Sequence, residues 1–388
     1  MEFCIIASNY PTPDRQVHVF LDNLVQKFVD RGIKCNVIAP QSSFSYMKRK
    51  NIRREAVSER TTPGGNKYTV YSPLYTVYPA KKICGVYLSD STKKSFFRAV
   101  RKTYKKYNMN ADVVYSHFIQ AGIPAVMLAK ELGVPSFIAN GEAETIRETS
   151  NISPKLLKST LDNVSGIISV STKNKDEISE LSNGRKSVMD KVRIIPNATD
   201  STKFFHKDKA ECRRTLGLPE DKFIVTFTGS FIERKGIMKL SEALDRFDDV
   251  YSMFIGVGDS KPQCRNILHT GRVLNSKMCD YLNASDLFVL PTLAEGCCNA
   301  IVEAVTCGVP VVSSDRSFNY DVLDKSNSIL VDPLSVDEIY NAIKTLKENE
   351  DMRQALSQGC LEKAKELSLD ARTERILSFI EEKKSLAK

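Results

Sequence analysis

Short β-branched runs alternate with helical patterns along most of this chain, and this alternation restricts its fold more than any other feature. Strands that alternate with helical stretches indicate βαβ units and a parallel sheet. A first series predicts strands at 3–7, 35–39, 113–115, 136–139, 167–170 and 193–195, with a helix at 17–30. A second series predicts strands at 223–228, 253–255, 287–290, 309–312 and 329–331. We therefore predict an α/β protein with two doubly wound parallel-sheet domains.

The length of 388 residues also favours two domains, because single cores stop growing at about 250–300 residues. The turn-rich segment 196–200 fits a hinge. We predict an N-terminal domain at 1–197, a C-terminal domain at 198–367, and a last helix at about 368–388 that packs back on the first domain. Residues 335–383 read as helical, opening with a capping box of Ser335 and Glu338. If the domains face each other, a central cleft at the carboxyl ends of both sheets is the expected ligand site.

The composition and the charge limit the classes of protein to which this chain can belong. The N-terminus lacks a basic region before an apolar run, and no stretch approaches the length of about 18 apolar residues that would suggest a membrane span. Ten cysteines without a Cys-x-x-Cys pair indicate reduced thiols rather than disulfides or a metal site. We expect a cytoplasmic protein with no metal ion. Residues 1–200 hold 30 Lys and Arg against 18 Asp and Glu, and this basic half should face an anionic partner.

Residues 93–107 place five apolar side chains near one helical face and seven Lys or Arg on most of the rest. A basic amphipathic helix with aromatic residues can lie on an anionic membrane surface. The alternative is a helix that faces the core and has a solvated basic side. A second basic cluster at 48–54 favours the membrane, so we expect peripheral attachment to the inner face of the cell membrane. No nucleic-acid-binding motif is recognisable.

The stretch 290–304 carries the most chemical information. It reads as strand, loop and helix, and the unpaired N–H groups at a helix N-terminus favour a phosphate or diphosphate. Glu295 lies before the helix and Glu303 about one turn inside it. Two carboxylates that flank a phosphate site could accept hydrogen bonds from the hydroxyls of a nucleotide sugar. The alternative is that Glu303 is a solvated helix residue and Glu295 an ordinary loop charge.

This stretch resembles the Glu-x7-Glu motif of glycosyltransferase family 4, whose members are retaining enzymes of the GT-B fold. The resemblance extends over nearly the whole chain. Segment 284–291 is similar to what precedes the motif in that family, 195–200 to its interdomain segment, 227–230 with 234–236 to its phosphate-binding strand and loop, and 256–258 to a further glycine turn. The resemblance implies a GT-B fold and transfer of a sugar from a nucleotide sugar.

The resemblance also assigns residues. Glu303 would hold the ribose, Glu295 the donor sugar and Lys235 the diphosphate, with backbone amides of Gly296, Cys297 and Cys298 completing the donor site. The remaining donor-side candidates are Gly229, Ser230, Arg234 and Asn299, with Arg272 and Val273 near the nucleobase. The acceptor-side candidates are Arg15, Gln16, His117, Asn140 and Glu142. Glu295, Lys235 and His117 are the candidate catalytic residues, although His117 could equally be a structural histidine.

Three departures from the family pattern affect these assignments. Ser230 stands where the family usually has an arginine on the diphosphate, and Arg234 is the candidate replacement. The first loop, 11–16, lacks the family's two glycines, so it should be stiffer. Asn140 stands where many relatives have a histidine near the reacting sugar, and an amide cannot act as a base.

Taken together, the sequence predicts a retaining, metal-independent hexosyltransferase without a cofactor. Its donor would be a nucleotide sugar, with UDP-sugars first, and its acceptor a glycan or a lipid-linked glycan of bacterial surface polysaccharide synthesis. No Asp-x-Asp pair is present to hold a metal diphosphate, and no Ser/His/Asp order appears. The alternatives are a sugar-nucleotide epimerase of the same fold and a non-catalytic sugar-nucleotide or glycan-binding protein.

Overall fold

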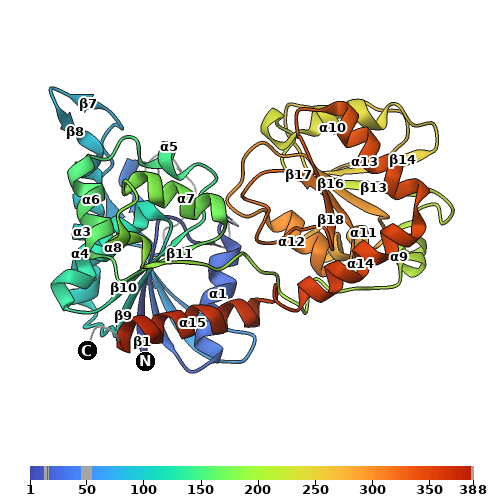
Figure 1. The fold of residues 1–388 in the computed structure, drawn as a ribbon. Helices are drawn as coiled ribbons and strands as arrows, with labels where there is room; N and C mark the ends of the chain where they lie inside the picture. Colours follow the sequence, from blue (N-terminus) through green and yellow to red (C-terminus); the bar gives the residue numbers. More distant parts are fainter. Residues whose placement is uncertain (13–14, 16, 45–54, 386–388) are drawn as a thin grey trace. The chain divides into compact units, whose positions relative to one another are not determined.

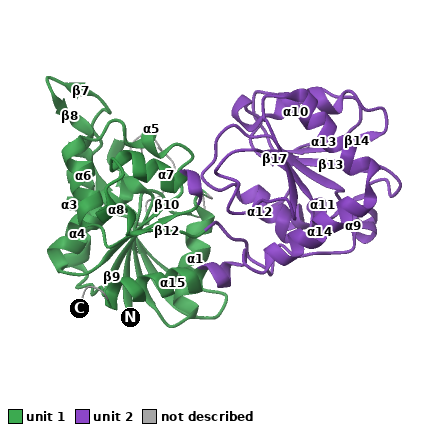
Figure 2. Ribbon diagram, in the orientation of Figure 1, with its two compact units in different colours: residues 1–170, 174–195, 373–388 green, residues 171–173, 196–372 purple. Residues whose placement is uncertain are grey.

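The computed structural model describes residues 1–12, 15, 17–44 and 55–385 of the chain. It divides into two compact units (Figures 1 and 2). The first unit contains residues 1–170, 174–195 and 373–388, and the second contains 171–173 and 196–372. The chain thus passes into the second unit at the start of the turn-rich segment 196–200, and it returns to the first within the last helix. Each unit is built around its own sheet, so the prediction of two parallel-sheet α/β domains is confirmed.

The described part of the first unit contains an eight-stranded sheet in the order β12-β11-β10-β9-β1-β2-β5-β4. Neighbouring strands are parallel, except that β4 and β5 form an antiparallel hairpin at one edge. The sheet strands are β1 (Glu2–Ala7), β2 (Lys34–Ile38), β4 (Val57–Thr61), β5 (Lys67–Tyr71), β9 (Val113–His117), β10 (Ser136–Asn140), β11 (Gly166–Ser169) and β12 (Val192–Ile194). Two small separate pairs are β3 (Gln41–Ser42) with β6 (Leu74–Tyr75), and β7 (Lys82–Ile83) with β8 (Val86–Tyr87).

Helices cover both faces of this sheet (Figure 1). They are α1 (Val19–Asp30), α3 (Leu88–Lys106), α4 (Ile119–Leu132), α5 (Thr145–Thr149), α6 (Pro154–Asn163), α7 (Thr172–Leu181) and α8 (Lys186–Met189). The end of the last helix, α15 (Leu369–Ser385), packs on the same unit, where the ring centroid of Phe379 lies 5.8 Å from that of Phe137 in β10. This contact explains why residues 373–388 group with the N-terminal residues.

The described part of the second unit contains a six-stranded, all-parallel sheet in the order β15-β14-β13-β16-β17-β18. Its strands are β13 (Phe223–Thr228), β14 (Val250–Ile255), β15 (Ile267–Gly271), β16 (Leu287–Leu290), β17 (Val311–Ser314) and β18 (Ser328–Val331). Its helices are α9 (Lys209–Leu216), η1 (Glu233–Lys235), α10 (Ile237–Leu244), η2 (Asn275–Lys277), α11 (Met278–Asn283), α12 (Asn299–Thr306), α13 (Val336–Glu348) and α14 (Glu350–Ala364). Numbered within the unit, the strand order is 3-2-1-4-5-6, the order of dinucleotide-binding folds. Such sheets bind ligands where the order reverses, here between β13 and β16.

The helical stretch 335–383 contains three helices, and its capping box is only half formed. The Ser335 hydroxyl accepts a hydrogen bond from the Glu338 backbone N–H at 3.2 Å, as the motif requires. The Glu338 carboxylate, however, accepts from the backbone N–H of Asp332 at 2.7 Å rather than from Ser335. The helix start at α13 is therefore stabilised together with the turn that precedes it.

The apolar side of the basic stretch 93–107 faces the protein. Within α3, Phe96 and Val100 are buried, and Phe97 and Tyr104 pack against the same core cluster. Of the five apolar residues, Tyr107 alone is exposed. The core-facing alternative is thus the one that the structure shows, because this side is not free to enter a bilayer. The basic cluster 48–54 falls in residues 45–54, outside the described part of the chain.

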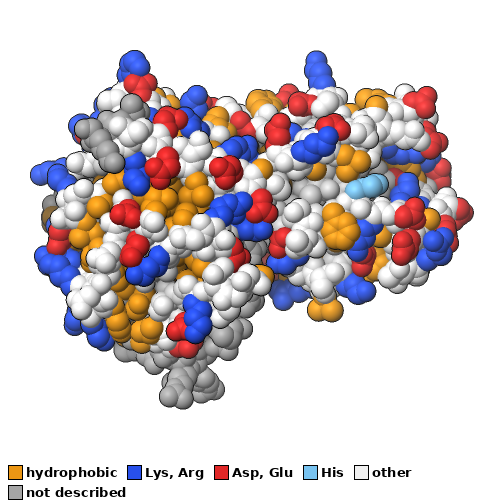
Figure 3. Space-filling view, turned by 90° about the horizontal axis from the view of Figure 1, so that it is seen from below, with side chains coloured by type: hydrophobic (Ala, Val, Ile, Leu, Met, Phe, Trp, Pro, Cys, Tyr) orange, Lys and Arg blue, Asp and Glu red, His pale blue; other side chains and the backbone are white. Residues whose placement is uncertain are grey.

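Two further observations bear on the membrane and the charge. None of the helices in the described ranges is both long enough and apolar enough to cross a bilayer. Figure 3 shows one face of the molecule, on which Lys and Arg side chains are interspersed with Asp and Glu. On that face, the basic excess is not gathered into one patch.

Candidate functional site

A recess lies where the strand order of the second sheet reverses. β13 ends at Thr228, β16 ends at Leu290, and the segments that follow these two strands both contribute to it. The residues that line it are Thr228, Gly229, Lys235, Glu295, Cys297, Cys298, Asn299, Ala300 and Glu303. Seven of these nine were predicted as donor-side residues, so the structure brings most of the predicted donor site together.

Glycines allow the loops around the recess to approach each other at backbone distance. Gly236, directly after Lys235, has φ 71°, and a Cβ at this position would lie 2.0 Å from the carbonyl oxygen of Pro291. A Cβ on Gly256 would lie 1.8 Å from the carbonyl oxygen of Gly229. Real side chains cannot occupy such space, so these contacts between loops require glycine. The predicted glycine motifs therefore fix the positions of the loops after β13, β14 and β16.

The recess contains a buried cluster of ion pairs. Lys235 Nζ lies 2.5 Å from Glu295 Oε1, and each side chain is only about one-eighth exposed, at 13% and 12%. Arg234 Nη1 lies 3.2 Å from the same carboxylate oxygen and donates a further hydrogen bond to the carbonyl oxygen of Ala294. The fully buried Thr292 hydroxyl donates to Glu295 Oε1 at 3.1 Å. Three donors thus hold one carboxylate oxygen of Glu295 in place.

The charge states in the recess suit an anionic ligand. Burial lowers the pKa of Lys235, but the charge of the Glu295 carboxylate and the hydrogen bond to it act in the opposite direction, and the net shift is upward. Burial raises the pKa of the Cys297 thiol to about 12 and also raises that of Cys298, so both thiols are neutral near pH 7. α12 begins directly after Cys298, whose side chain makes no capping hydrogen bond to the helix. A diphosphate would meet a cation and helix N–H groups here without competition from thiolates.

Glu303 has a different environment. It lies one turn inside α12 and lines the recess, and burial raises its pKa to about 7. Within the described residues its carboxylate has no hydrogen-bond or ion-pair partner. A buried carboxylate without partners is costly in the empty protein and gains most from a ligand that donates hydrogen bonds. The solvated-helix alternative for Glu303 is therefore disfavoured.

Thr228 is a lining residue that the sequence reasoning missed. Its hydroxyl is buried, lines the recess and has no hydrogen-bond partner among the described residues. Buried hydroxyls are rarely left unpaired unless a ligand or water serves them. The sequence places Thr228 at the end of the predicted strand 223–228, but only the structure shows that its hydroxyl is buried and unpaired within the described part of the chain.

We expect Thr228→Val to weaken binding of the nucleotide about 3–10-fold, the value of one hydrogen bond of about 0.5–1.5 kcal/mol. The same change should leave the empty protein as stable or more stable, because an unpaired buried hydroxyl is removed. The control is Thr226→Val on the same strand, whose hydroxyl lies 2.5 Å from that of Ser285. That control should lower the melting temperature without weakening nucleotide affinity. Thermal denaturation with and without UDP separates the two, and a Thr228→Val protein with unchanged affinity would contradict the assignment.

Asn197 is a second missed residue. It lies in the predicted hinge, and its side-chain amide donates to the Cys297 carbonyl oxygen at 3.0 Å and to Asn299 Oδ1 at 2.9 Å. Both partners belong to the loop that precedes α12 or to the first turn of that helix. Asn197 thus holds the segment whose backbone amides would face a diphosphate. No pattern in the sequence joins residues 197 and 297, so only the structure reveals this contact.

We expect Asn197→Ala to weaken nucleotide binding about tenfold, because the segment 297–299 loses two hydrogen bonds. Asn266→Ala is the matched control, since its amide also makes two hydrogen bonds, to the carbonyl oxygens of Asp248 and Val250. Asn266 does not line the recess. Both variants should lose a similar amount of stability in denaturant titrations, and only Asn197→Ala should lose affinity. Equal affinities would show that Asn197 supports the fold alone.

Five predicted donor-side residues are not among those that line the recess: Ser230, Arg234, Arg272, Val273 and Gly296. Ser230 follows Gly229 and is exposed, and it is not among the lining residues. Arg272 and Val273 follow β15 at the carboxyl edge of the sheet, and neither lines the recess. Arg234 contacts the Glu295 loop through its hydrogen bonds to the Ala294 carbonyl oxygen and the Glu295 carboxylate.

The acceptor-side candidates lie in the first unit. His117 ends β9, which pairs with β1 where that sheet reverses its order, and its ring packs against Phe20 and Phe118 at centroid distances of 5.2 and 5.0 Å. Arg15 is exposed, and its backbone exchanges two hydrogen bonds with that of Thr12. Gln16 lies outside the described residues.

Asn140 and Glu142 form part of a buried network at the end of β10. The Asn140 amide donates to the Asn174 carbonyl oxygen at 3.4 Å, and its oxygen accepts from Thr145. Glu142 accepts from the Ile119 N–H at 2.7 Å, at the start of α4, and burial raises its pKa to about 7. Both side chains therefore make hydrogen bonds that stabilise the fold. A sugar could bind them only by replacing these hydrogen bonds.

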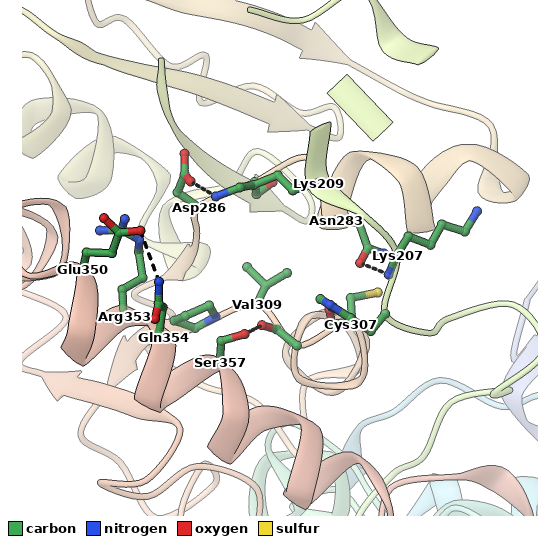
Figure 4. Close-up of a pocket in the computed structure, with 14 residues that line it drawn as sticks. Lys207, Lys209, Asn283, Asp286, Cys307, Val309, Glu350, Arg353, Gln354 and Ser357 are labelled. Carbon is green, nitrogen blue, oxygen red and sulfur yellow. Dashed lines mark hydrogen bonds and ion pairs between the residues drawn. The ribbon is translucent and has the colours of Figure 1, made fainter. Parts of the chain in front are cut away.

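A second pocket lies at the opposite edge of the sheet in the second unit, beside the residues that precede β16 and β17 (Figure 4). Its polar side chains form hydrogen bonds and ion pairs with neighbouring groups of the protein. Lys209 pairs with Asp286 at 2.6 Å, Gln354 donates to Glu350 at 3.2 Å, and the Lys207 backbone N–H donates to Asn283. This pocket therefore offers a ligand fewer free groups than the recess beside β13 and β16.

Comparison with known proteins finds similar glycosyltransferases. Residues 222–349 match the family model Glycosyl transferases group 1. The chain is 28% identical over 360 residues to "Putative teichuronic acid biosynthesis glycosyltransferase TuaC" of Bacillus subtilis, with 88% of each chain covered. It is 24% identical over 290 residues to "UDP-Gal:alpha-D-GlcNAc-diphosphoundecaprenol alpha-1,3-galactosyltransferase" of Escherichia coli, covering 69% of this chain and 73% of that one.

Similar solved structures show which fold this chain has. Sucrose-phosphate synthase from Thermosynechococcus elongatus superposes with a TM-score of 0.75 at 17% identity, covering 98% of each chain. Anabaena Alr3699/HepE in complex with UDP and glucose gives 0.69 at 16% identity, covering 98% of this chain and all of that one. The chain is a glycosyltransferase with the GT-B fold. Its resemblance to glycosyltransferase family 4, expected from the Glu-x7-Glu stretch, is confirmed by the group 1 family match and the named relatives.

Proposed function

We propose that the protein transfers a hexose from a nucleotide sugar, with UDP-sugars first, to a glycan or lipid-linked acceptor of bacterial surface polysaccharide synthesis. The transfer would retain the anomeric configuration and need no metal ion. One observation carries the proposal: a buried Lys235–Glu295 pair lies in the same recess as Glu303, whose carboxylate has no partner within the described residues.

Each group in the recess has a part in this proposal. The backbone amides of 296–298 and the Lys235 ammonium bind the diphosphate, and the Glu303 carboxylate accepts from the ribose hydroxyls. Lys235 exchanges its bond to Glu295 for the phosphate when the donor enters. Glu295, still held by Arg234 and Thr292, then accepts from hydroxyls of the donor sugar.

The chemistry follows from that placement. The bond between the sugar and the diphosphate breaks as the acceptor hydroxyl attacks from the same face, and the leaving phosphate oxygen takes the hydroxyl proton. Negative charge grows on the diphosphate as it leaves, and Lys235 with the helix N–H groups stabilises it. The protein therefore contributes position and fixed charge rather than a covalent intermediate.

The relatives support the proposed substrates by their names. The TuaC relative is named for teichuronic acid biosynthesis, and the Escherichia coli relative for a UDP-sugar donor and a diphosphoundecaprenol acceptor. Anabaena Alr3699/HepE is solved with UDP and glucose. A lipid-linked acceptor would place the working enzyme at the cytoplasmic face of the membrane, attached peripherally.

The test is a donor screen. The protein is incubated with UDP-, GDP- and ADP-sugars, with and without a lipid-linked acceptor fraction and soluble acceptors, in the presence of EDTA. Release of nucleotide from one donor that depends on acceptor, with a product whose anomeric proton keeps the donor's configuration, is the expected result. An inverted product, or turnover that EDTA abolishes, would overturn the mechanism. Tight binding without turnover on any acceptor would favour the binding-protein alternative, and conversion of the donor sugar without acceptor would favour the epimerase.

A further inference from the structure

A short hairpin projects from the body of the first unit (Figure 1). In it Lys82 pairs with Tyr87 and Ile83 with Val86, and the turn between the strands, Cys84-Gly85, has positive φ at both residues, 46° and 82°. Two central residues with positive φ give the tight turn that best suits a two-residue hairpin. All residues from 76 to 86 are exposed. The hairpin is therefore a defined structure that little of the described chain covers.

The base of the hairpin is held by α3. The backbone N–H of Thr76 donates to the Ser95 hydroxyl and that of Tyr78 to the Thr92 hydroxyl, both at 2.9 Å. The Leu88 N–H donates to the Lys81 carbonyl oxygen at 3.1 Å. An isolated two-stranded hairpin is marginal in water, so these three bonds matter for keeping the projection in one place.

The exposed side chains of this segment are unusually apolar. Val77, Tyr78, Ile83 and Val86 are 44%, 41%, 53% and 60% exposed. Single exposed apolar side chains need no explanation, but four within ten residues of a projecting segment indicate a contact surface. Their combined area is small against the roughly 1,200–2,000 Å² that a stable protein interface buries. A partner that accepts a narrow apolar tip fits better than a flat protein surface.

The charge around the tip is strongly basic. Segment 76–107 contains nine Lys or Arg and one acidic residue, Asp90. Lys81 and Lys82 lie in the hairpin, and Lys94 and Arg98 are exposed on the following helix α3. Further along α3, Arg101 and Lys105 pair with Glu131, whereas Lys81, Lys82, Lys94 and Arg98 near the hairpin have no ion pair within the described residues.

From this combination we infer that the β7–β8 hairpin docks the protein on an anionic lipid bilayer. Ile83 and Val86 enter the boundary between headgroups and acyl chains, Tyr78 lies at the headgroup level, and the lysines face the anionic headgroups. The surface differs from the expected one, since the aromatic side of α3 packs on the core and the projecting hairpin takes its place. The inference is separable from the donor chemistry, because it concerns the first unit alone.

A probe on Cys84 tests it. Cys84 is the exposed one of the ten cysteines, Cys264 is partly buried and the other eight are buried, so a polarity-sensitive thiol dye reports on the hairpin tip. A Cys84→Ser protein controls for labelling elsewhere. With vesicles of phosphatidylglycerol and phosphatidylethanolamine we expect a blue shift of the dye and sedimentation with the vesicles at least tenfold stronger than with phosphatidylcholine. Absence of both would overturn the inference.

Variants locate the contact. Ile83→Asp combined with Val86→Asp should lower vesicle binding at least tenfold, as should Lys81→Glu combined with Lys82→Glu. Val57→Asp is the control, because Val57 is 38% exposed on β4 of the same unit. Vesicle binding that survives both hairpin variants would contradict the inference. So would a dimer of the wild type, seen by light scattering, that the hairpin variants dissociate, because the occupant would then be a second copy.

The readout is independent of the proposed function. Binding of UDP in solution without vesicles should be the same in the wild type and the hairpin variants. A protein that sediments with vesicles but turns over no donor would support this inference and refute the proposed function. A protein that turns over a donor but does not bind vesicles would refute this inference and support the proposed function.

Discussion

Lys235→Ala lowers turnover of the donor about 10²–10³-fold, the size of effect seen when one group that stabilises a developing negative charge is removed. The change removes the ammonium that would bind the diphosphate, and it also leaves Glu295 Oε1 without its partner at 2.5 Å. Arg234 and Thr292 still hold that carboxylate, so the loop itself should persist. Steady-state kinetics with the donor found by the screen measure the effect.

Two further variants separate charge from structure. Lys239→Ala removes a lysine four residues away whose nearest acid, Glu242, lies 3.8 Å off at the surface, and it should leave turnover unchanged. In the double variant Lys235→Ala with Glu295→Gln, the uncompensated negative charge facing the diphosphate is gone. We expect its nucleotide affinity to exceed that of Lys235→Ala alone, a coupling that a double-mutant cycle measures. Two independent, additive losses would contradict the paired arrangement.

Between pH 6 and pH 8 the affinity for nucleotide rises up to about tenfold more in the wild type than in Glu303→Gln, where only the ionisation of the nucleotide's own phosphate remains. Burial raises the pKa of Glu303 to about 7, so the group is mostly protonated at pH 6 and mostly ionised at pH 8. Only the ionised form accepts from both ribose hydroxyls. Titration calorimetry with UDP at several pH values measures the dependence, and Glu348→Gln on α13, an exposed glutamate, is the control.

Ionisation of Glu303 has the opposite effect on the stability of the empty protein, because it lowers the free energy of unfolding. Its pKa is near 4.5 in the unfolded chain and about 7 in the folded protein, so the folded state binds the proton more tightly. The contribution of Glu303 to the free energy of unfolding is therefore fully present below pH 4.5 and is lost as the pH rises through 7. We expect Glu303→Gln to stabilise the empty protein at pH 8 by about 1–3 kcal/mol, measured by denaturant titration. A destabilised variant would show that the carboxylate has a structural partner.

Most strands predicted from sequence are ones that the fold buries on both faces, although the partly buried edge strands β12 and β18 were predicted as well. β1, β13 and β16 are rich in apolar residues, and every residue in their centres is buried, so the pattern and the structure agree. β4 was missed because its residues are alternately exposed and half-buried at the edge of the sheet, and none of its side chains is fully buried. Edge strands carry a weaker apolar signal, which also explains the missed β15.

The residues of the candidate site also fall into two groups, those that the sequence predicts and those that only the structure reveals. Glu295, Lys235 and Glu303 could be predicted because they lie in local motifs that resemble those of a known family, and the structure brings them into one recess. The contact of Asn197 with the loop at 297–299 and the unpaired hydroxyl of Thr228 depend on three-dimensional placement, which no spacing reports. For helix α3 the sequence could not decide between two structures, because an amphipathic helix has the same pattern whether its apolar side contacts a bilayer or a protein core.

The most direct test of the central claim is titration calorimetry of UDP, GDP and ADP into the wild type, Lys235→Ala and Glu303→Ala proteins, in EDTA at pH 8. We predict that one nucleotide, UDP first, binds the wild type and that each variant binds it at least tenfold more weakly, with no gain when Mg²⁺ replaces EDTA. Binding that both variants retain in full would place the nucleotide outside this recess and contradict the account.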